Sequence, residues 1–290
     1  MSAALPGAAP GATSVATPGT TPVAATAAPR RAAALEPRRL LGALVPAALL
    51  SAWWLATRGR DYGLIPSPGE MLAALADLAF GTEGDAFSGR LPAHVAASVE
   101  RVYGAFLLAA VIALPLGMLI GRLRVARELL DPLLQLLRPI PVTAWLPLSM
   151  ILFGLGARSA FFLVALGAFF PILVNTIFAV RSVDARLFEA AAMLGVSRTR
   201  MFPVVVVPAS LPGVLTGLRL GLGFAWVVIV VGEMTGVQTG LGAMIMDARQ
   251  LSRTDIVVAG MAVIGALGFL SDMAVLSLGR RLLRWNPANA

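Results

Sequence analysis

Three long stretches without a single charged residue constrain this sequence most: residues 102–121, 139–157 and 159–180. A helix that rises 1.5 Å per residue needs about 20 residues to cross about 30 Å of hydrocarbon, and each stretch is close to that length. The whole chain is 58% hydrophobic and 13% charged, which lies outside the range of soluble domains. The stretches therefore predict membrane-spanning helices and exclude a soluble globule.

Three further apolar stretches bring the predicted spans to six, namely residues 40–57, 209–232 and 256–279. Backbone polar groups in lipid must be satisfied within each span, so the predicted fold is an all-α integral membrane bundle. The predicted organisation along the chain is a disordered Ala/Pro/Thr-rich cytoplasmic tail (1–36), a first transmembrane helix with a periplasmic segment (37–98), a core transmembrane domain (99–280) with a cytoplasmic loop (181–208), and a cytoplasmic C-terminal tail (281–290).

The basic residues predict the orientation in the membrane. All 23 are arginine, and the formal net charge is +8. Placing the N-terminus inside puts about twice as many arginines on the cytoplasmic side as outside, so we expect both termini in the cytoplasm. Because these arginines are spread over separate segments, they favour contact with anionic lipid of the bilayer and disfavour nucleic-acid binding.

The composition also limits which catalytic and metal sites the chain can form. The chain has no cysteine and one histidine, His94, which we interpret as a polar loop residue. We expect no catalytic residue, no metal and no cofactor. A phosphate-binding loop of the G-x4-G-K-[ST] type needs a lysine, and the sequence has none, so ATP hydrolysis is expected from a separate polypeptide.

Residues 181–208, between the fourth and fifth predicted spans, contain the most informative pattern. Asp184 can cap a short helix, and Gly195 can end it. The run Ala190-Ala191-Ala192 gives that helix a bare face, which another protein surface could approach closely. The pattern predicts an exposed cytoplasmic helix suited to a protein partner.

This segment resembles a known signature. Glu189-Ala190-Ala191, Gly195, Val205, Val207 and Pro208 match the E-A-A-x3-G-x9-I-x-L-P pattern of the inner-membrane permeases of bacterial ABC importers, with valine at both aliphatic positions. The resemblance implies a type I, MetI-like permease bundle. It also implies that Glu189, Ala190, Ala191, Gly195 and Pro208 couple the membrane domain to two copies of a cytoplasmic ABC ATPase subunit. A second permease copy and a periplasmic substrate-binding protein are the other implied partners, in the bacterial inner membrane.

Shorter matches point to a substrate. The resemblance covers roughly residues 66–287 and is similar to the subfamily that serves sulfonates, nitrate, taurine and bicarbonate. Residues 247–258 and 284–288 are most similar to aliphatic sulfonate permeases. Nitrate, taurine or bicarbonate remain alternatives for the carried anion. A secondary transporter is the alternative of a different class; it would be favoured by paired repeats or several intramembrane carboxylates, which the sequence does not show.

Polar residues within or at the ends of the predicted spans are candidates for the translocation pathway. Arg219 falls near mid-membrane, where a charge costs roughly 2.5–3.5 kcal/mol, so it either lines an anion pathway or pairs with a carboxylate. Glu233 lies at the outer end of the fifth span and either gates the outer mouth or faces water. Asp272 is expected to be solvated or paired with an arginine.

Glycines recur every four residues in two spans, at 117 and 121 and at 213, 217 and 221. Small residues at this spacing allow helices to approach closely. The pattern favours tight packing within one subunit, and a seam between two copies is the alternative.

Overall fold

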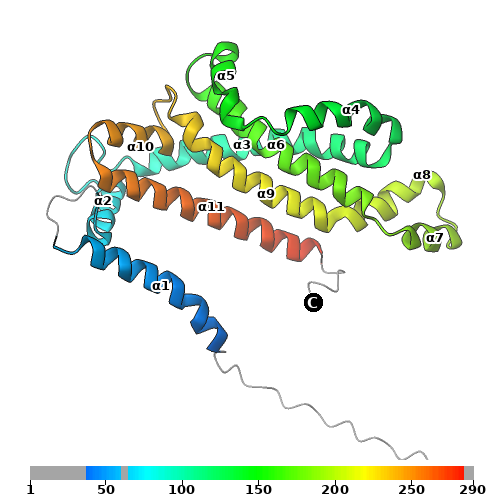
Figure 1. Ribbon diagram of the computed structural model, residues 1–290, viewed down its shortest axis with the longest axis horizontal. Helices are drawn as coiled ribbons and strands as arrows, with labels where there is room; N and C mark the ends of the chain where they lie inside the picture. The colour runs from blue at the N-terminus through cyan, green and yellow to red at the C-terminus, as the bar shows by residue number, and fades with distance from the viewer. Residues whose placement is uncertain (1–36, 60–64, 284–290) are drawn as a thin grey trace, which may run out of the picture. The chain divides into compact units, whose positions relative to one another are not determined.

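The computed structural model describes residues 37–59 and 65–283, and every regular element in those ranges is a helix (Figure 1). The predicted tail 1–36 and residues 284–290 lie outside the described residues. The elements are α1 (Pro37–Thr57), α2 (Pro68–Phe80), α3 (Leu91–Arg122), α4 (Arg124–Leu137), η1 (Val142–Trp145), α5 (Leu146–Phe153), α6 (Ala157–Arg181), α7 (Ala185–Met193), α8 (Arg198–Met201), η2 (Phe202–Val206), α9 (Val207–Glu233), α10 (Leu241–Gln250) and α11 (Thr254–Leu282). The predicted all-helical membrane fold is confirmed.

The described residues divide into two units, with the boundary between Leu49 and Leu50, so each is described by itself. Helix α1 crosses this boundary and contains the first predicted span, of which Leu44–Thr57 is an apolar helical stretch. Within the second unit, the indole nitrogen of Trp53 donates a hydrogen bond to the carbonyl oxygen of Pro66 at 3.1 Å.

Four helices in the described ranges are long and apolar enough to cross a membrane. They are α3, α6, α11 and the continuous helical stretch Arg198–Glu233, which joins α8, η2 and α9. These four contain the second, fourth, fifth and sixth predicted spans. Each extends beyond its predicted bounds, because the polar residues at the ends of these helices continue the same hydrogen-bonded turns.

The third predicted span, residues 139–157, does not form one continuous helix. The structure places there the 3₁₀ turn η1 and the eight-residue α5, which rises only about 12 Å. The helical segment Val142–Phe153 follows α4 in the chain, and the axes of the two segments are bent by 88° relative to one another. Pro139 and Pro141 lack the backbone N–H that would continue a helix from α4, so the chain turns at this point. Helix α4 was missed, because its charged residues were interpreted as a cytoplasmic loop.

The centre of the second unit is made by α6, which packs against α3 on one side and α9 on the other. A Cβ added at Gly121 of α3 would lie 2.8 Å from Cβ of Val180, and one added at Gly221 of α9 would lie 2.6 Å from Cγ1 of Ile172. Val180 and Ile172 both belong to α6. The same close approach occurs at Gly117, Gly213 and Gly217. The glycines therefore pack helices within the chain, as the first of the two interpretations predicts.

This packing makes a matched pair of substitutions informative. Gly221→Leu should destabilise the folded chain by at least about 1–3 kcal/mol, because the new side chain must displace Ile172 in a close-packed interface. Gly223→Leu lies on the same helix with no atom within 4 Å of its Cβ position and should leave stability nearly unchanged. Thermal melting of the two purified proteins in detergent measures the difference. Equal melting temperatures would contradict the assigned packing.

Candidate functional site

The segment between α6 and α9 begins with a short capped helix. Asp184 is the N-cap of α7, and its carboxylate accepts a hydrogen bond from the backbone N–H of Arg186 at 2.9 Å. Gly195 takes a left-handed conformation with φ +78°, which costs glycine nothing. The N–H of Val196 then donates to the carbonyl of Ala191 at 3.0 Å and closes the helix end. The predicted cap and stop of this helix are confirmed.

Helix α7 presents apolar side chains to the outside. Met193 is 88% exposed and Leu194 is 85% exposed, while Leu187 is 45% exposed. Among the predicted coupling residues, Glu189 and Ala190 are exposed, whereas Ala191 is buried. Apolar side chains at this level of exposure, grouped on one short helix, are typical of a protein interaction site. Met193 and Leu194 were missed by the sequence analysis, which considered only the alanine run of this helix.

The segment returns to the bundle through a modified helix. Figure 1 shows α7 and α8 beyond the adjoining ends of α6 and α9. The chain then passes through η2, a π-helical stretch that contains Pro203, and reaches Pro208 in the first turn of α9. Both prolines lack the N–H that an α-helix would use, and a π-turn is one way a helix accommodates such a gap. Pro208 therefore connects the exposed segment directly to a membrane-spanning helix.

At the opposite end of α9, Glu233 lies in a buried polar network. Its side chain has no exposed surface. It accepts hydrogen bonds from Arg101 at 2.6 Å, from the Ser98 hydroxyl at 2.8 Å and from the backbone N–H of Gly242 at 2.9 Å. The network joins α3, α9 and the start of α10. Glu233 thus faces neither water nor an open cavity in this conformation. Its hydrogen bonds connect α9 to α3 and α10.

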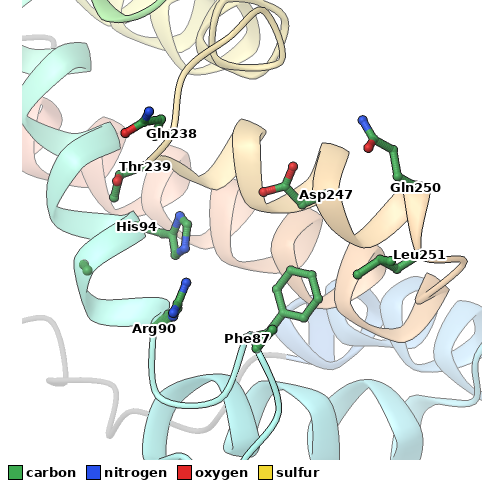
Figure 2. A pocket seen from close by; sticks show the side chains of 10 residues that line it. Phe87, Arg90, His94, Gln238, Thr239, Asp247, Gln250 and Leu251 are labelled. Carbon is green, nitrogen blue, oxygen red and sulfur yellow. The ribbon is translucent and has the colours of Figure 1, made fainter.

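The neighbouring histidine corrects one expectation. His94 is buried on α3, so its interpretation as a loop residue is wrong. Its Nδ1 lies 2.8 Å from the carbonyl oxygen of Gly240 and 3.1 Å from the backbone nitrogen of the same residue. His94 borders a hollow of about 540 Å³ that Arg90 and Asp247 also line (Figure 2). Figure 2 shows Arg90 and His94 along α3 and Asp247 along α10, on either side of this hollow.

Arg219 is paired at a partly exposed position between α9 and α11. Its Nε and Nη2 donate to the two carboxylate oxygens of Asp272, each at 2.7 Å, in a bidentate arrangement that joins α9 to α11. The two side chains are 39% and 40% exposed. Of the two interpretations of Arg219, the structure shows the carboxylate pair, and the arginine pairing expected for Asp272 is confirmed.

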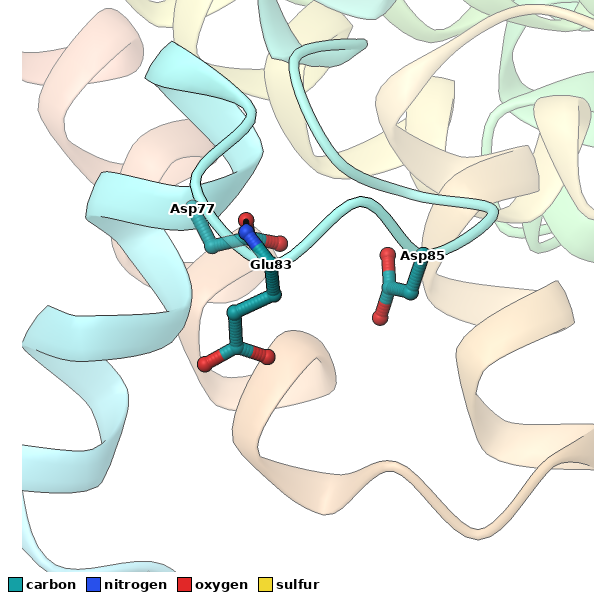
Figure 3. Close-up of side chains that lie close together, drawn as sticks. All are labelled: Asp77, Glu83 and Asp85. Carbon is teal, nitrogen blue, oxygen red and sulfur yellow. Dashed lines mark hydrogen bonds between the residues drawn. The ribbon is translucent and has the colours of Figure 1, made fainter.

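A cluster of acidic side chains lies at the C-terminal end of α2 and in the loop that follows it (Figure 3). Asp77 accepts hydrogen bonds from the backbone N–H of Glu83 at 2.6 Å and from the Ser88 hydroxyl at 2.7 Å. The first of these is the main cause that lowers the pKa of Asp77. The backbone N–H of Phe87 does the same to the pKa of Asp85, which also pairs with Arg253 at 2.8 Å. These carboxylates are engaged by protein donors, and they shape the loop that leads into α3.

These features define a class of protein: a helical membrane protein with a capped helix that exposes apolar side chains between two of its spans. The family model described as "Binding-protein-dependent transport system inner membrane component" matches residues 113–284, more than half of the chain. The chain belongs to this family and is therefore an ABC transporter permease, a membrane transport subunit rather than an enzyme. Membership implies an ATPase partner and an inner-membrane location.

Individual relatives are also transport permeases, in agreement with the family model. The chain is 39% identical over 246 residues to a putative aliphatic sulfonates transport permease protein of Bacillus subtilis, covering 84% of this chain and 87% of that one. It is 38% identical over 242 residues to a taurine transport system permease protein of Escherichia coli, covering 83% and 87%. A solved structure of the MetNI methionine ABC transporter in inward-facing conformations matches with a TM-score of 0.58 at 19% identity, covering 66% of this chain and 95% of that one. That likeness shows the MetI-like type I fold alone.

Proposed function

We propose that this chain forms the translocation pathway of an ATP-driven importer for an aliphatic sulfonate. Two copies of the chain assemble with two ATPase subunits and receive substrate from a periplasmic binding protein, and both termini face the cytoplasm of a bacterium. The inside-positive arginine distribution supports that orientation. The observation that carries the assembly is the exposed apolar end of α7, since Met193 and Leu194 have no partner in the described part of the chain that covers them.

Within this proposal, Glu189, Ala190, Ala191, Gly195 and Pro208 act in coupling. Ala191 and Gly195 fix the shape of α7, while Glu189 and Ala190 lie exposed beside the apolar residues. Pro208 passes movement of α7 to α9 through η2. Arg219 and Glu233 serve the pathway by holding α3, α9, α10 and α11 in place, because both side chains are engaged by protein partners.

Uptake by reconstituted vesicles tests the proposed substrate. Vesicles that contain the full chain with its ATPase and binding protein should accumulate a labelled alkanesulfonate when ATP is supplied on the side of the membrane that carries the ATPase. Uptake should persist when a protonophore collapses the proton gradient, which separates this mechanism from a secondary transporter. Loss of uptake with the protonophore alone would overturn the ATP-driven proposal.

Taurine is the second candidate, because the taurine permease relative is nearly as similar as the sulfonate one. Inhibition of labelled alkanesulfonate uptake by unlabelled taurine or unlabelled alkanesulfonate decides between the two substrates. Nitrate and bicarbonate are tested as inhibitors in the same way. An excess of unlabelled taurine that suppresses uptake more than an equal excess of alkanesulfonate would replace the sulfonate assignment. The reverse order would support it.

A further inference from the structure

A cavity with opposite chemical character at its two ends lies between α3 and α6, where α5 ends. It has a volume of about 620 Å³, within the range of small-molecule sites. Its lining residues are Ala97, Glu100, Arg101, Leu108, Phe153, Ala157, Arg158, Phe161, Phe162 and Ala165. Arg101 and Arg158 lie in the N-terminal halves of α3 and α6, and Leu108 and Ala165 lie about two turns further along the same helices.

The outer end of the cavity offers hydrogen-bond donors. Arg158 lies in the first turn of α6, is exposed and makes no side-chain hydrogen bond within the described chain. Arg101 uses one terminal nitrogen for Glu233 and keeps 16% of its side chain exposed. The N-terminus of α6 has no side-chain cap, so its free N–H groups and the helix dipole also favour an anion there. Glu100 also lines this end and is exposed.

The deeper end is apolar and partly aromatic. Phe153 and Phe162 lie with ring centroids 5.1 Å apart, and Phe153 is 44% exposed. A Cβ added at Gly104 of α3 would lie 3.1 Å from the ring of Phe161, so the absence of a side chain at Gly104 makes room for that ring. Seven residues separate Arg101 from Leu108 on α3, and seven separate Arg158 from Ala165 on α6, which is about 10 Å of helix in each case.

We propose that this cavity is a substrate subsite of the permease itself, in which Arg158 and Arg101 hold a sulfonate group and the phenylalanine wall takes the alkyl chain. A sulfonate has three acceptor oxygens, which suit the fork of donors on a guanidinium. The apolar length beyond the arginines suits a chain of several methylene groups. The subsite rests on the proposed function, and it adds selection for chain length within the membrane subunit.

Uptake by the reconstituted full complex tests the cationic end. Arg158→Gln should raise KM for hexanesulfonate about tenfold or more, and Arg158→Lys should recover part of that loss, because it restores the charge without the fork. Arg249→Gln is the matched control, since Arg249 is exposed on α10, outside the cavity. It should leave KM unchanged. An unchanged KM in Arg158→Gln overturns the subsite.

A chain-length series tests the apolar end. From methanesulfonate to hexanesulfonate, KM of the wild type should fall about threefold to fourfold for each methylene group that becomes buried. Phe162→Ala should flatten this dependence and leave KM for methanesulfonate nearly unchanged. The melting temperature and the ATP hydrolysis of the complex establish that the variant is folded and assembled. A slope that survives in folded Phe162→Ala overturns the apolar part of the subsite.

Two further outcomes separate failure of the subsite from failure of the proposed function, and a substrate site from a lipid site. A wild type that transports no sulfonate overturns the proposed function and the subsite together, whereas sulfonate uptake that is indifferent to Arg158→Gln overturns the subsite alone. An anionic lipid headgroup could use the same donors, so the assay is repeated in phosphatidylcholine and in phosphatidylglycerol nanodiscs with hydrolysis as the readout. The effect of Arg158→Gln should persist in phosphatidylcholine. Its restriction to phosphatidylglycerol identifies a lipid site and overturns the proposal.

Discussion

The double substitution Met193→Asp with Leu194→Asp is expected to abolish ATP-driven uptake and to release the ATPase subunit from the membrane complex. The two side chains are 88% and 85% exposed, so their replacement removes little packing within the chain. In the proposed complex they are buried against the ATPase, where an unpaired carboxylate costs several kcal/mol, so two such groups should lower affinity by a factor of at least 1,000, or about 4 kcal/mol. Co-purification of the ATPase with the tagged permease and uptake in vesicles measure the loss.

Leu251→Asp is the matched control for that double variant. Leu251 is 63% exposed and lies at the end of α10, at the other end of α9 from α7. The same change of chemistry there should leave ATPase co-purification intact. Normal uptake by the double variant would show that α7 is not the docking element, and a lowered melting temperature would show that its apolar residues stabilise the chain itself.

Arg101→Met is expected to lower the free energy of unfolding by about 3–5 kcal/mol, because it breaks a buried ion pair by removing one partner. The substitution leaves the Glu233 carboxylate fully buried without the one cationic partner that it has among the described residues. Glu233→Gln in the same chain should recover more than half of the loss, because the amide oxygen still accepts from the N–H of Gly242 while the buried charge is removed. Reversible unfolding in mixed detergent gives the free energies, and melting temperatures give a second measure.

Arg124→Met supplies the comparison for this second prediction. Arg124 pairs with Glu128 one turn along α4, and the two side chains are 86% and 62% exposed. Screening by water makes such a pair worth about 0.5 kcal/mol or less, so the substitution should hardly change stability. Equal losses for Arg101→Met and Arg124→Met would mean that the Glu233 network is not buried as the structure has it.

The sequence predicted those parts of the fold that depend on short-range pattern. Continuous apolar stretches predicted the long helices, and Asp184 with Gly195 predicted both ends of α7, because caps and hydropathy act over a few residues. Glycine spacing predicted close helix packing. It could not say which helix would be the partner, since that depends on how the helices are rotated relative to one another.

The parts that were missed depend on long-range placement. Arg101 and Glu233 are 132 residues apart, and no local pattern links them; for Arg219 and Asp272, 53 residues apart, an ion pair was expected but the partner of each could not be named. His94 was taken for a loop residue because nothing nearby in sequence shows that Gly240 lies against it. The 88° bend between α4 and Val142–Phe153 was missed because hydropathy alone does not show where prolines turn an apolar stretch.

The glycine contacts along α6 have a mechanical consequence. At these glycines the side chains of α6 rest directly on the backbones of α3 and α9, so little free space is left that could absorb a displacement. In the proposed coupling, a displacement of α9 that begins at η2 would therefore move α3 and α6 with it. The movement would reach the buried Glu233 network at the other end of α9.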